Sequence, residues 1–246
     1  PFLLGLSAAF TVRIKNDLAD KIWHMVFLFL MPIIIMTMTE ALNDVFVYDM
    51  TYLGFLGNYL VIIIMLFLMF AFTGSFRVAY LVVTSILFGF AVAHSYIMDF
   101  RGTPFLPMDF LSVTTAIGVA NTYDYTPTYK VISAAMIFIF IIIIAIKTKT
   151  PKYNLLTKIT SRTFMGTFAA VLLLLFFGTS VFANMGVRPD FWNQTRGYKN
   201  YGFVFNFFCN TKYLYMSEPN DYNPGEIGNI VEKEENEIEI DNSYEK

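Results

Sequence analysis

The sequence predicts an all-α membrane protein with five transmembrane helices, a cytoplasmic N-terminus, an extracytoplasmic C-terminus and interfacial helices on the outer face. Hydrophobic residues make up 56% of the chain and charged residues 15%, against roughly 45–50% and about 25% in soluble domains. The apolar residues gather in five long stretches without charge in their centres, and Lys and Arg collect on alternate connecting segments. These observations indicate a multi-pass protein of the cell membrane.

Each apolar stretch approaches or exceeds the length needed to cross a hydrocarbon core of about 30 Å. We expect spans at 22–39, 51–72, 78–98, 129–146 and 163–187, preceded by a cytoplasmic or interfacial segment at 1–21. An extracellular juxtamembrane segment at 188–217 and an acidic linker at 218–246 should follow, the linker leading to a further extracellular domain. Because the chain begins with Pro1 rather than Met, we expect it to be part of a longer protein.

The orientation follows from the distribution of Lys and Arg. With the N-terminus inside, the inner segments hold nine basic residues, five of them in the loop 147–162. The outer loops 40–50 and 99–127 hold only Arg101. Since cytoplasmic loops carry the excess of Lys and Arg, the C-terminus should be extracellular. The aromatic segment 202–216 should then lie as a helix on the outer surface, because its Phe and Tyr side chains suit the headgroup level.

The segment 99–109, called the lip below, is the candidate binding site. It contains Asp99, Arg101, Pro104, Pro107 and Asp109 between two apolar stretches. Pro107 followed by an early carboxylate predicts a helix start, with an interfacial helix over 107–120. A guanidinium pairs well with phosphate, so we predict that the lip docks an anionic lipid headgroup or a second domain. A salt bridge from Arg101 to Asp99 or Asp109 is the alternative.

Other chemistry is limited in this chain. The span centres lack Asp, Glu, Lys and Arg, which argues against a proton-coupled transporter or a channel with a charged filter. His24 and His94 lie near opposite ends of spans and cannot share a metal ion. The outer acids Asp44 and Asp49, with those of the lip, suit a hard cation, but solvated loop acids are the expected reading. We find no nucleophile with its base, no cofactor site and no metal ligand set, and one cysteine excludes an internal disulfide.

Two motifs resemble a known family. They are the lip pattern Arg101-Gly-x-Pro104-x-x-Pro107-x-Asp109 and the outer pattern Lys212-Tyr-Leu-Tyr-x-x-Glu218-Pro219-x-x-Tyr222. With five spans, they resemble the membrane half of lipoteichoic acid synthase-type phosphoglycerol transferases, over about residues 21–231. The resemblance implies a following extracellular domain of the sulfatase and alkaline-phosphatase type, with a manganese ion and a threonine nucleophile. That domain would move glycerol phosphate from phosphatidylglycerol onto a growing chain.

The resemblance therefore implies an anchor and lipid-facing domain that is itself non-catalytic. Its partners would be anionic lipids, phosphatidylglycerol above all, and its own extracellular catalytic domain, with no role for nucleic acid. Two alternatives stay open. Membrane glycosyltransferases that use polyprenyl-linked sugars often place an acid in their first outer loop, where Asp44 and Asp49 lie. A non-enzymatic membrane scaffold is the other alternative.

Overall fold

The computed structural model describes residues 17–112, 118, 124–147, 154–179, 181–187, 190 and 192–214. All regular structure in these residues is helical. The elements are α2 (Asp17–Asn43), α3 (Tyr52–Thr73), α4 (Phe76–Arg101), η1 (Pro107–Ser112), α6 (Tyr129–Lys147), α7 (Leu155–Gly178), α8 (Val181–Asn184), α9 (Gln194–Tyr201) and α10 (Phe203–Thr211). The predicted segments 1–12 and 218–246, and most of 113–123, lie outside the described residues.

Five of these helices are long and apolar enough to cross a membrane. The candidate spans are Met25–Asn43, Tyr52–Thr73, Phe76–Arg101, Tyr129–Lys147 and Leu155–Gly178. The prediction of five long apolar helices is confirmed, and the chain has the makeup of a multi-pass membrane protein.

Three of the five long helices differ clearly in their bounds from the predicted spans. The first continues past residue 39 to Asn43, so Glu40 belongs to a helix rather than to a loop. The third continues past residue 98 to Arg101, so Asp99 and Arg101 belong to α4 rather than to a loop. The fifth runs over Leu155–Gly178 instead of 163–187, and includes Lys158 and Arg162. Hydropathy marks the apolar part of a helix, whereas Lys and Arg favour the helical state and can extend it into the headgroup region.

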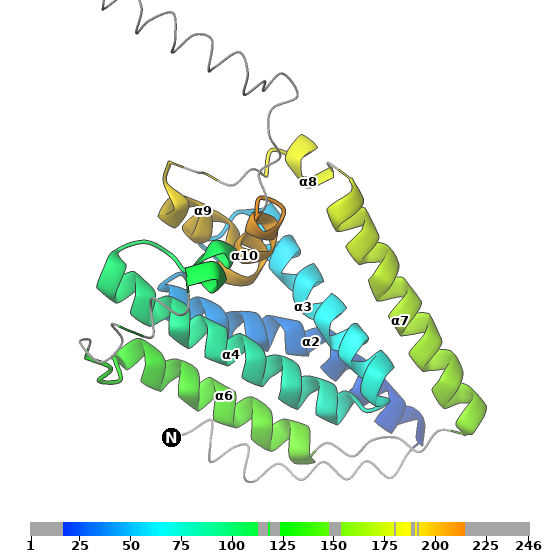
Figure 1. Cartoon of the computed structure of the whole chain (residues 1–246). Helices are drawn as coiled ribbons and strands as arrows, with labels where there is room; N and C mark the ends of the chain where they lie inside the picture. Colours follow the sequence, from blue (N-terminus) through cyan, green and yellow to red (C-terminus); the bar gives the residue numbers. More distant parts are fainter. Residues whose placement is uncertain are drawn as a thin grey trace, which may run out of the picture. The chain divides into compact units, whose positions relative to one another are not determined.

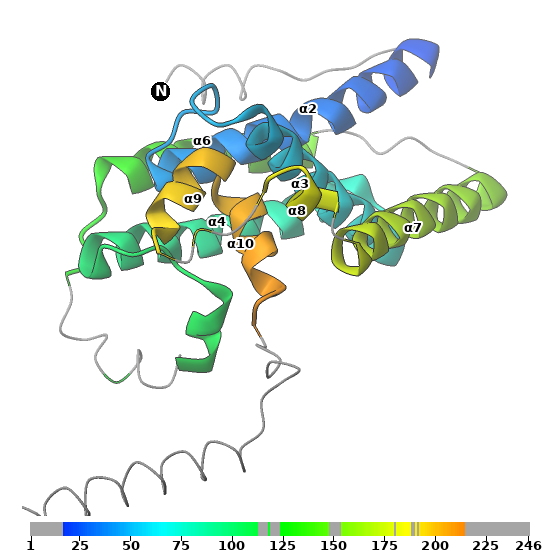
Figure 2. The ribbon, with the colours of Figure 1, turned by 90° about the horizontal axis from the view of Figure 1, so that it is seen from above.

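The helices α2, α4 and α6 lie side by side, and α3 packs against α2 and α4 (Figure 1). The helix α7 packs against α3, which both views show (Figures 1 and 2). The two run antiparallel, since Arg162 near the start of α7 donates to the carbonyls of Ala71 and Phe72 at the end of α3. Gly166 permits this approach, because a Cβ there would lie 2.9 Å from the Cβ of Ala71.

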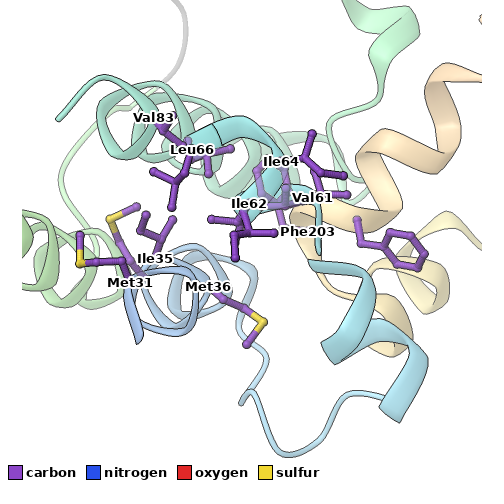
Figure 3. Close-up of a cluster of buried hydrophobic side chains, with 14 of the residues drawn as sticks. Met31, Ile35, Met36, Val61, Ile62, Ile64, Leu66, Val83 and Phe203 are labelled. Carbon is purple, nitrogen blue, oxygen red and sulfur yellow. The ribbon is translucent and has the colours of Figure 1, made fainter. Parts of the chain in front are cut away.

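The core between the helices is built mainly of branched aliphatic side chains and methionine. Figure 3 shows Ile35 from α2, Leu66 from α3 and Val83 from α4 in this cluster. Phe88 of α4 stacks on Phe138 of α6, with 4.4 Å between the ring centroids. Phe203 of α10 belongs to the same cluster. Among the residues labelled in Figure 3, it is the one that lies outside the five long helices.

The short helices α9 and α10 pack against the long helices near the end of α2 and the start of α3 (Figure 1). Phe203, Val204 and Phe205 are buried there, together with Cys209. The structure does not support the expectation that segment 202–216 lies on the surface as a helix with an exposed aromatic face. The physical reason is that α10 is buried against α2 and α3, where the backbone N–H groups of Phe203 and Phe205 find acceptors.

Candidate functional site: a buried polar cluster that holds the C-terminal helices

Four polar side chains form a buried cluster near the ends of three long helices. Glu40 and Asn43 come from the last turn of α2, Asn58 from the second turn of α3 and His94 from the end of α4. All four are buried, and Glu40 and Asn58 are completely inaccessible to solvent. Buried polar groups need hydrogen-bond partners, and most of the partners here are backbone groups of α9 and α10. We call these four residues the polar cluster.

The polar cluster caps the N-terminus of α10 from two different helices. The backbone N–H of Phe203 donates to Glu40 Oε1 over 2.8 Å, and that of Phe205 donates to Asn58 Oδ1 over 2.9 Å. The first N–H groups of any α-helix lack partners within the helix, and a carboxylate near them is favoured by the helix dipole. Because α10 has only nine residues, these bonds stabilise a helix that is too short to be stable alone.

The cluster also binds carbonyl groups of α9. The amide of Asn58 donates to the carbonyl of Tyr201 over 2.6 Å, and that of Asn43 donates to the carbonyl of Tyr198 over 3.2 Å. Thr51, just before α3, donates from both its backbone N–H and its hydroxyl to the carbonyl of Asn200, each over 2.9 Å. Donors and acceptors therefore recognise the peptide backbone on both sides of Gly202.

At Gly202 the backbone between α9 and α10 comes very close to the polar cluster. Its φ of 75° and ψ of 170° lie in a region that is open essentially only to glycine. A Cβ at this position would lie 2.6 Å from Met50 Sδ and 2.8 Å from Glu40 Oε1. Glycine is required here both by the backbone conformation and by the space that the polar cluster leaves.

His94 lies in a chain of hydrogen bonds whose direction is fixed. The backbone N–H of Phe105 donates to His94 Nδ1 over 3.2 Å, so the ring proton is on Nε2. Nε2 lies 3.0 Å from Asn43 Oδ1, which accepts this proton, and the Asn43 amide donates to Glu40 Oε2 over 2.9 Å. Both ring nitrogens are used, so His94 is a hydrogen-bonded structural residue with Asn43 and Phe105 as its partners.

The lip is held by one ion pair and its neighbours. Arg101 forms a bidentate pair with Asp109, with distances of 2.7 and 2.9 Å, and donates to the carbonyl of Pro104 over 2.7 Å. Asp109 Oδ2 also accepts from the backbone N–H of Leu106 over 2.7 Å. The helix η1 starts at Pro107 as predicted, although it is a 3₁₀ helix that ends at Ser112. The remainder of the predicted 107–120 helix lies almost wholly outside the described residues.

The structure brings together some of the predicted site residues and separates others. Arg101, Pro104 and Asp109 meet directly, and Pro107 is buried beside them. Asp99 is exposed and is not the partner of Arg101 in this ion pair. The pairing favours the salt bridge that the sequence left open as the alternative, because Asp109 already occupies the bidentate face of the guanidinium. The side chain of Arg101 is still 44% exposed.

The acids Asp44, Asp49, Asp99 and Asp109 of the predicted outer loops do not form a common centre. Asp44 pairs with Lys130 over 3.4 Å and is largely exposed. Among the described residues, no group of three or more His, Cys, Asp or Glu has an arrangement that would hold a metal ion.

Phe105 connects the lip to the C-terminal helices. Its carbonyl accepts from the hydroxyl of Tyr198 over 2.7 Å, and its N–H donates to His94. Its ring lies 5.5 Å from that of Phe207 in α10 and 5.3 Å from that of Phe110 in η1. Burial raises the pKa of Tyr198 well above its usual value, so the phenol stays protonated and can donate this bond.

Sequence reasoning did not find the polar cluster. The sequence alone predicts a loop at Glu40 and indicates no role for Asn43, Asn58 or Tyr198. One signal was available: Glu40 and Asn43 have the i, i+3 spacing of one helix face, directly after an apolar stretch. Asn58 is likewise a strong hydrogen-bonding group inside an apolar stretch, where such a group needs a partner.

The arrangement is suited to binding rather than to bond breaking. Glu40, Asn43 and Asn58 are each engaged with backbone groups, and both nitrogens of His94 have partners. What the cluster does chemically is to recognise the peptide groups of residues 198–205 and hold them at one end of the helices.

Comparison of the chain with models of known protein families, with curated proteins and with solved structures gives no match.

Proposed function

We propose that this chain is the membrane anchor and lipid-facing domain of a cell-envelope phosphoglycerol transferase that builds polyglycerol phosphate from phosphatidylglycerol. One observation carries the proposal. After the fifth long helix the chain returns to the end of the bundle, where the polar cluster fixes α9 and α10 by buried hydrogen bonds. An anchor that must hold a following extracellular domain at a set position needs such a fixed exit. The resemblance of the lip and of the pattern beginning at Lys212 supplies the identity of that domain.

The distribution of side chains supports an orientation with this end outside. Lys147, Lys158 and Arg162 belong to the opposite end, where α6 finishes and α7 begins. At the end that carries the polar cluster, aromatic residues are exposed, as a belt at the membrane–water interface would require. They include Phe46, Tyr48, Tyr52 and Tyr129. Since Lys and Arg are more frequent on the cytoplasmic side of membrane proteins, this distribution supports an extracellular C-terminus for the proposed cell-membrane anchor.

In this proposal the lip lies at the level of the outer headgroups. Phe110 and Leu111 of η1 are exposed apolar residues, and the ring of Phe110 contacts that of Phe90 on α4. This surface would meet lipid, while the exposed side of Arg101 would contact an anionic headgroup or the catalytic domain. Asp109 accepts hydrogen bonds from both terminal nitrogens of the Arg101 guanidinium. A phosphate would therefore bind the remaining N–H groups of Arg101 or compete with Asp109.

The catalytic step would belong to the extracellular domain that the resemblance implies, with its manganese ion and threonine nucleophile. The described residues contribute anchoring and lipid contact. A non-enzymatic scaffold is the second candidate, and it is favoured by the fact that the polar cluster binds backbone rather than presenting reactive groups.

The test is an assay of the product of the complete gene in membranes with labelled phosphatidylglycerol and manganese. We expect release of diacylglycerol and growth of a glycerol phosphate polymer, and neither from residues 1–246 alone. Transfer of sugar from a polyprenyl donor instead would support the glycosyltransferase alternative. If a correctly inserted protein consumes neither phosphatidylglycerol nor the polyprenyl donor, the result would favour the non-enzymatic scaffold.

A further inference from the structure

We propose that the Arg101–Asp109 pair positions α10 through Phe105, so that the lip and the C-terminal helices move as one unit. This conformational coupling goes beyond the proposed transferase and does not depend on it. Its elements are an ion pair at the surface, a turn, and a buried helix, joined by contacts that the structure gives one after another.

The first step joins the ion pair to the turn. Arg101 donates to Asp109 and to the carbonyl of Pro104, and Asp109 accepts from the N–H of Leu106. The residues on either side of Phe105 are therefore both bonded to the pair. Removing the guanidinium releases the Pro104 carbonyl and leaves Asp109 without its cation.

The second step joins the turn to α9 and α10. The carbonyl of Phe105 is the acceptor for the hydroxyl of Tyr198, which is almost fully buried at 1% exposure. The ring of Phe105 contacts that of Phe207, and the rings of Phe110 and Phe207 also meet at 6.3 Å. A buried hydroxyl that loses its acceptor is costly, so a shift of Phe105 is transmitted to Tyr198 rather than absorbed.

The docking of α10 can be measured through Cys209, which lies on α10 itself. Cys209 is the only cysteine of the chain and is 6% exposed. Burial raises its pKa to about 12, so its thiol reacts with a maleimide only when α10 opens away from α2 and α3. The rate of labelling in the folded protein therefore measures how firmly α10 is docked.

The experiment compares labelling rates in purified protein in lipid nanodiscs. Arg101→Ala should raise the rate at Cys209 by about tenfold, because it removes the bond to the Pro104 carbonyl as well as the ion pair with Asp109. Asp44→Asn is the matched control, because it breaks the other ion pair at this end, with Lys130, through a largely exposed side chain that lies outside the lip. It should change the rate by less than about twofold.

A double-mutant cycle separates coupling from general loosening. Tyr198→Phe removes only the hydroxyl and should also raise the rate. If the two residues act through Phe105, Arg101→Ala together with Tyr198→Phe should give much less than the product of the two separate increases. Multiplicative increases, or an Arg101→Ala variant with the wild-type rate, would overturn the proposal.

Asp109→Asn guards against a variant that fails to fold. It keeps an oxygen for the N–H of Leu106 but lacks the charge that holds Arg101, so its labelling rate should lie between wild type and Arg101→Ala. Amide exchange in the same samples should rise in α10 and stay unchanged around Ile62 in α3. Equal increases in both helices would show global destabilisation and contradict a coupling confined to the lip and α10.

Discussion

At the scale of single residues, the junction between α9 and α10 depends on Gly202 and on the Glu40 side chain, which binds the backbone next to it. Gly202 brings the chain close enough for Glu40 to reach the N–H of Phe203. Each change at these positions has a definite physical cost, because the surroundings are buried and already paired.

Gly202→Ala should weaken the docking of α10 by about 2–4 kcal/mol, from backbone strain and from overlap with Met50 and Glu40. The measurement is thermal unfolding in detergent, together with maleimide labelling of Cys209. Gly186→Ala is the matched control, since its φ of 84° is also positive, but nothing lies within 4 Å of the added Cβ and it is outside the lip. Its cost should be only about 1 kcal/mol, and equal effects of the two variants would contradict the role given to Gly202.

Glu40→Gln should destabilise the fold by about 1–3 kcal/mol. A carboxamide can accept from Phe203 or from Asn43 with its single oxygen, but not from both as the carboxylate does. Denaturant unfolding checks this result, with the exposed Asp44→Asn as a control that should cost no more than about 1 kcal/mol. A Glu40→Gln protein as stable as the wild type would show that the two bonds contribute little.

At the scale of elements, the local sequence pattern predicts the long helices but not the position of the short ones. Apolar stretches predicted all five long helices because hydropathy adds up over neighbouring residues. The start of η1 at Pro107 followed from the proline and the early carboxylate. The docking of α10 did not follow, because Phe203 and Glu40 are 163 positions apart and their pairing has no local signal. The sequence likewise predicts a basic loop at Arg162, because the carbonyl that accepts from its side chain belongs to another helix and leaves no local signal.

The contact between α3 and α7 tests one of these long-range pairings. Gly166→Ala would place a Cβ 2.9 Å from that of Ala71, so the contact must open and stability should fall. Adding Ala71→Gly should restore the stability, since the glycine then lies on α3 and the alanine on α7, and the two helices can again approach closely. Gly89→Ala, an exposed helical position with nothing within 4 Å, should instead stabilise by up to about 1 kcal/mol. Thermal unfolding of the three variants and the wild type decides, and a double variant no more stable than Gly166→Ala would contradict the close approach.

At the scale of the whole described domain, the chain turns back on itself after the fifth helix. Lys212, just beyond α10, donates to the carbonyl of Thr179 at the end of α7 and lies 4.7 Å from the ring centre of Phe176. With the polar cluster on α2, α3 and α4, this contact ties the last described turn to four of the five long helices. The exit of the chain is therefore set by side chains from across the domain, which is what the proposed role as an anchor requires.

The orientation gives the last prediction. If the excess of Lys and Arg lies inside, Asn154 before α7 faces the cytoplasm, whereas Tyr48 and Thr103 face outward. In a Cys209→Ala background, cysteine at 48 or 103 should react with a membrane-impermeant maleimide in intact cells. Cysteine at 154 should react only after the membrane is opened, and all three positions are exposed, so access is not limited by burial. The wild-type protein is the control, and it should remain unlabelled because Cys209 is buried and its pKa is about 12. Labelling of position 154 in intact cells would invert the topology and place the lip, the polar cluster and α10 on the cytoplasmic side.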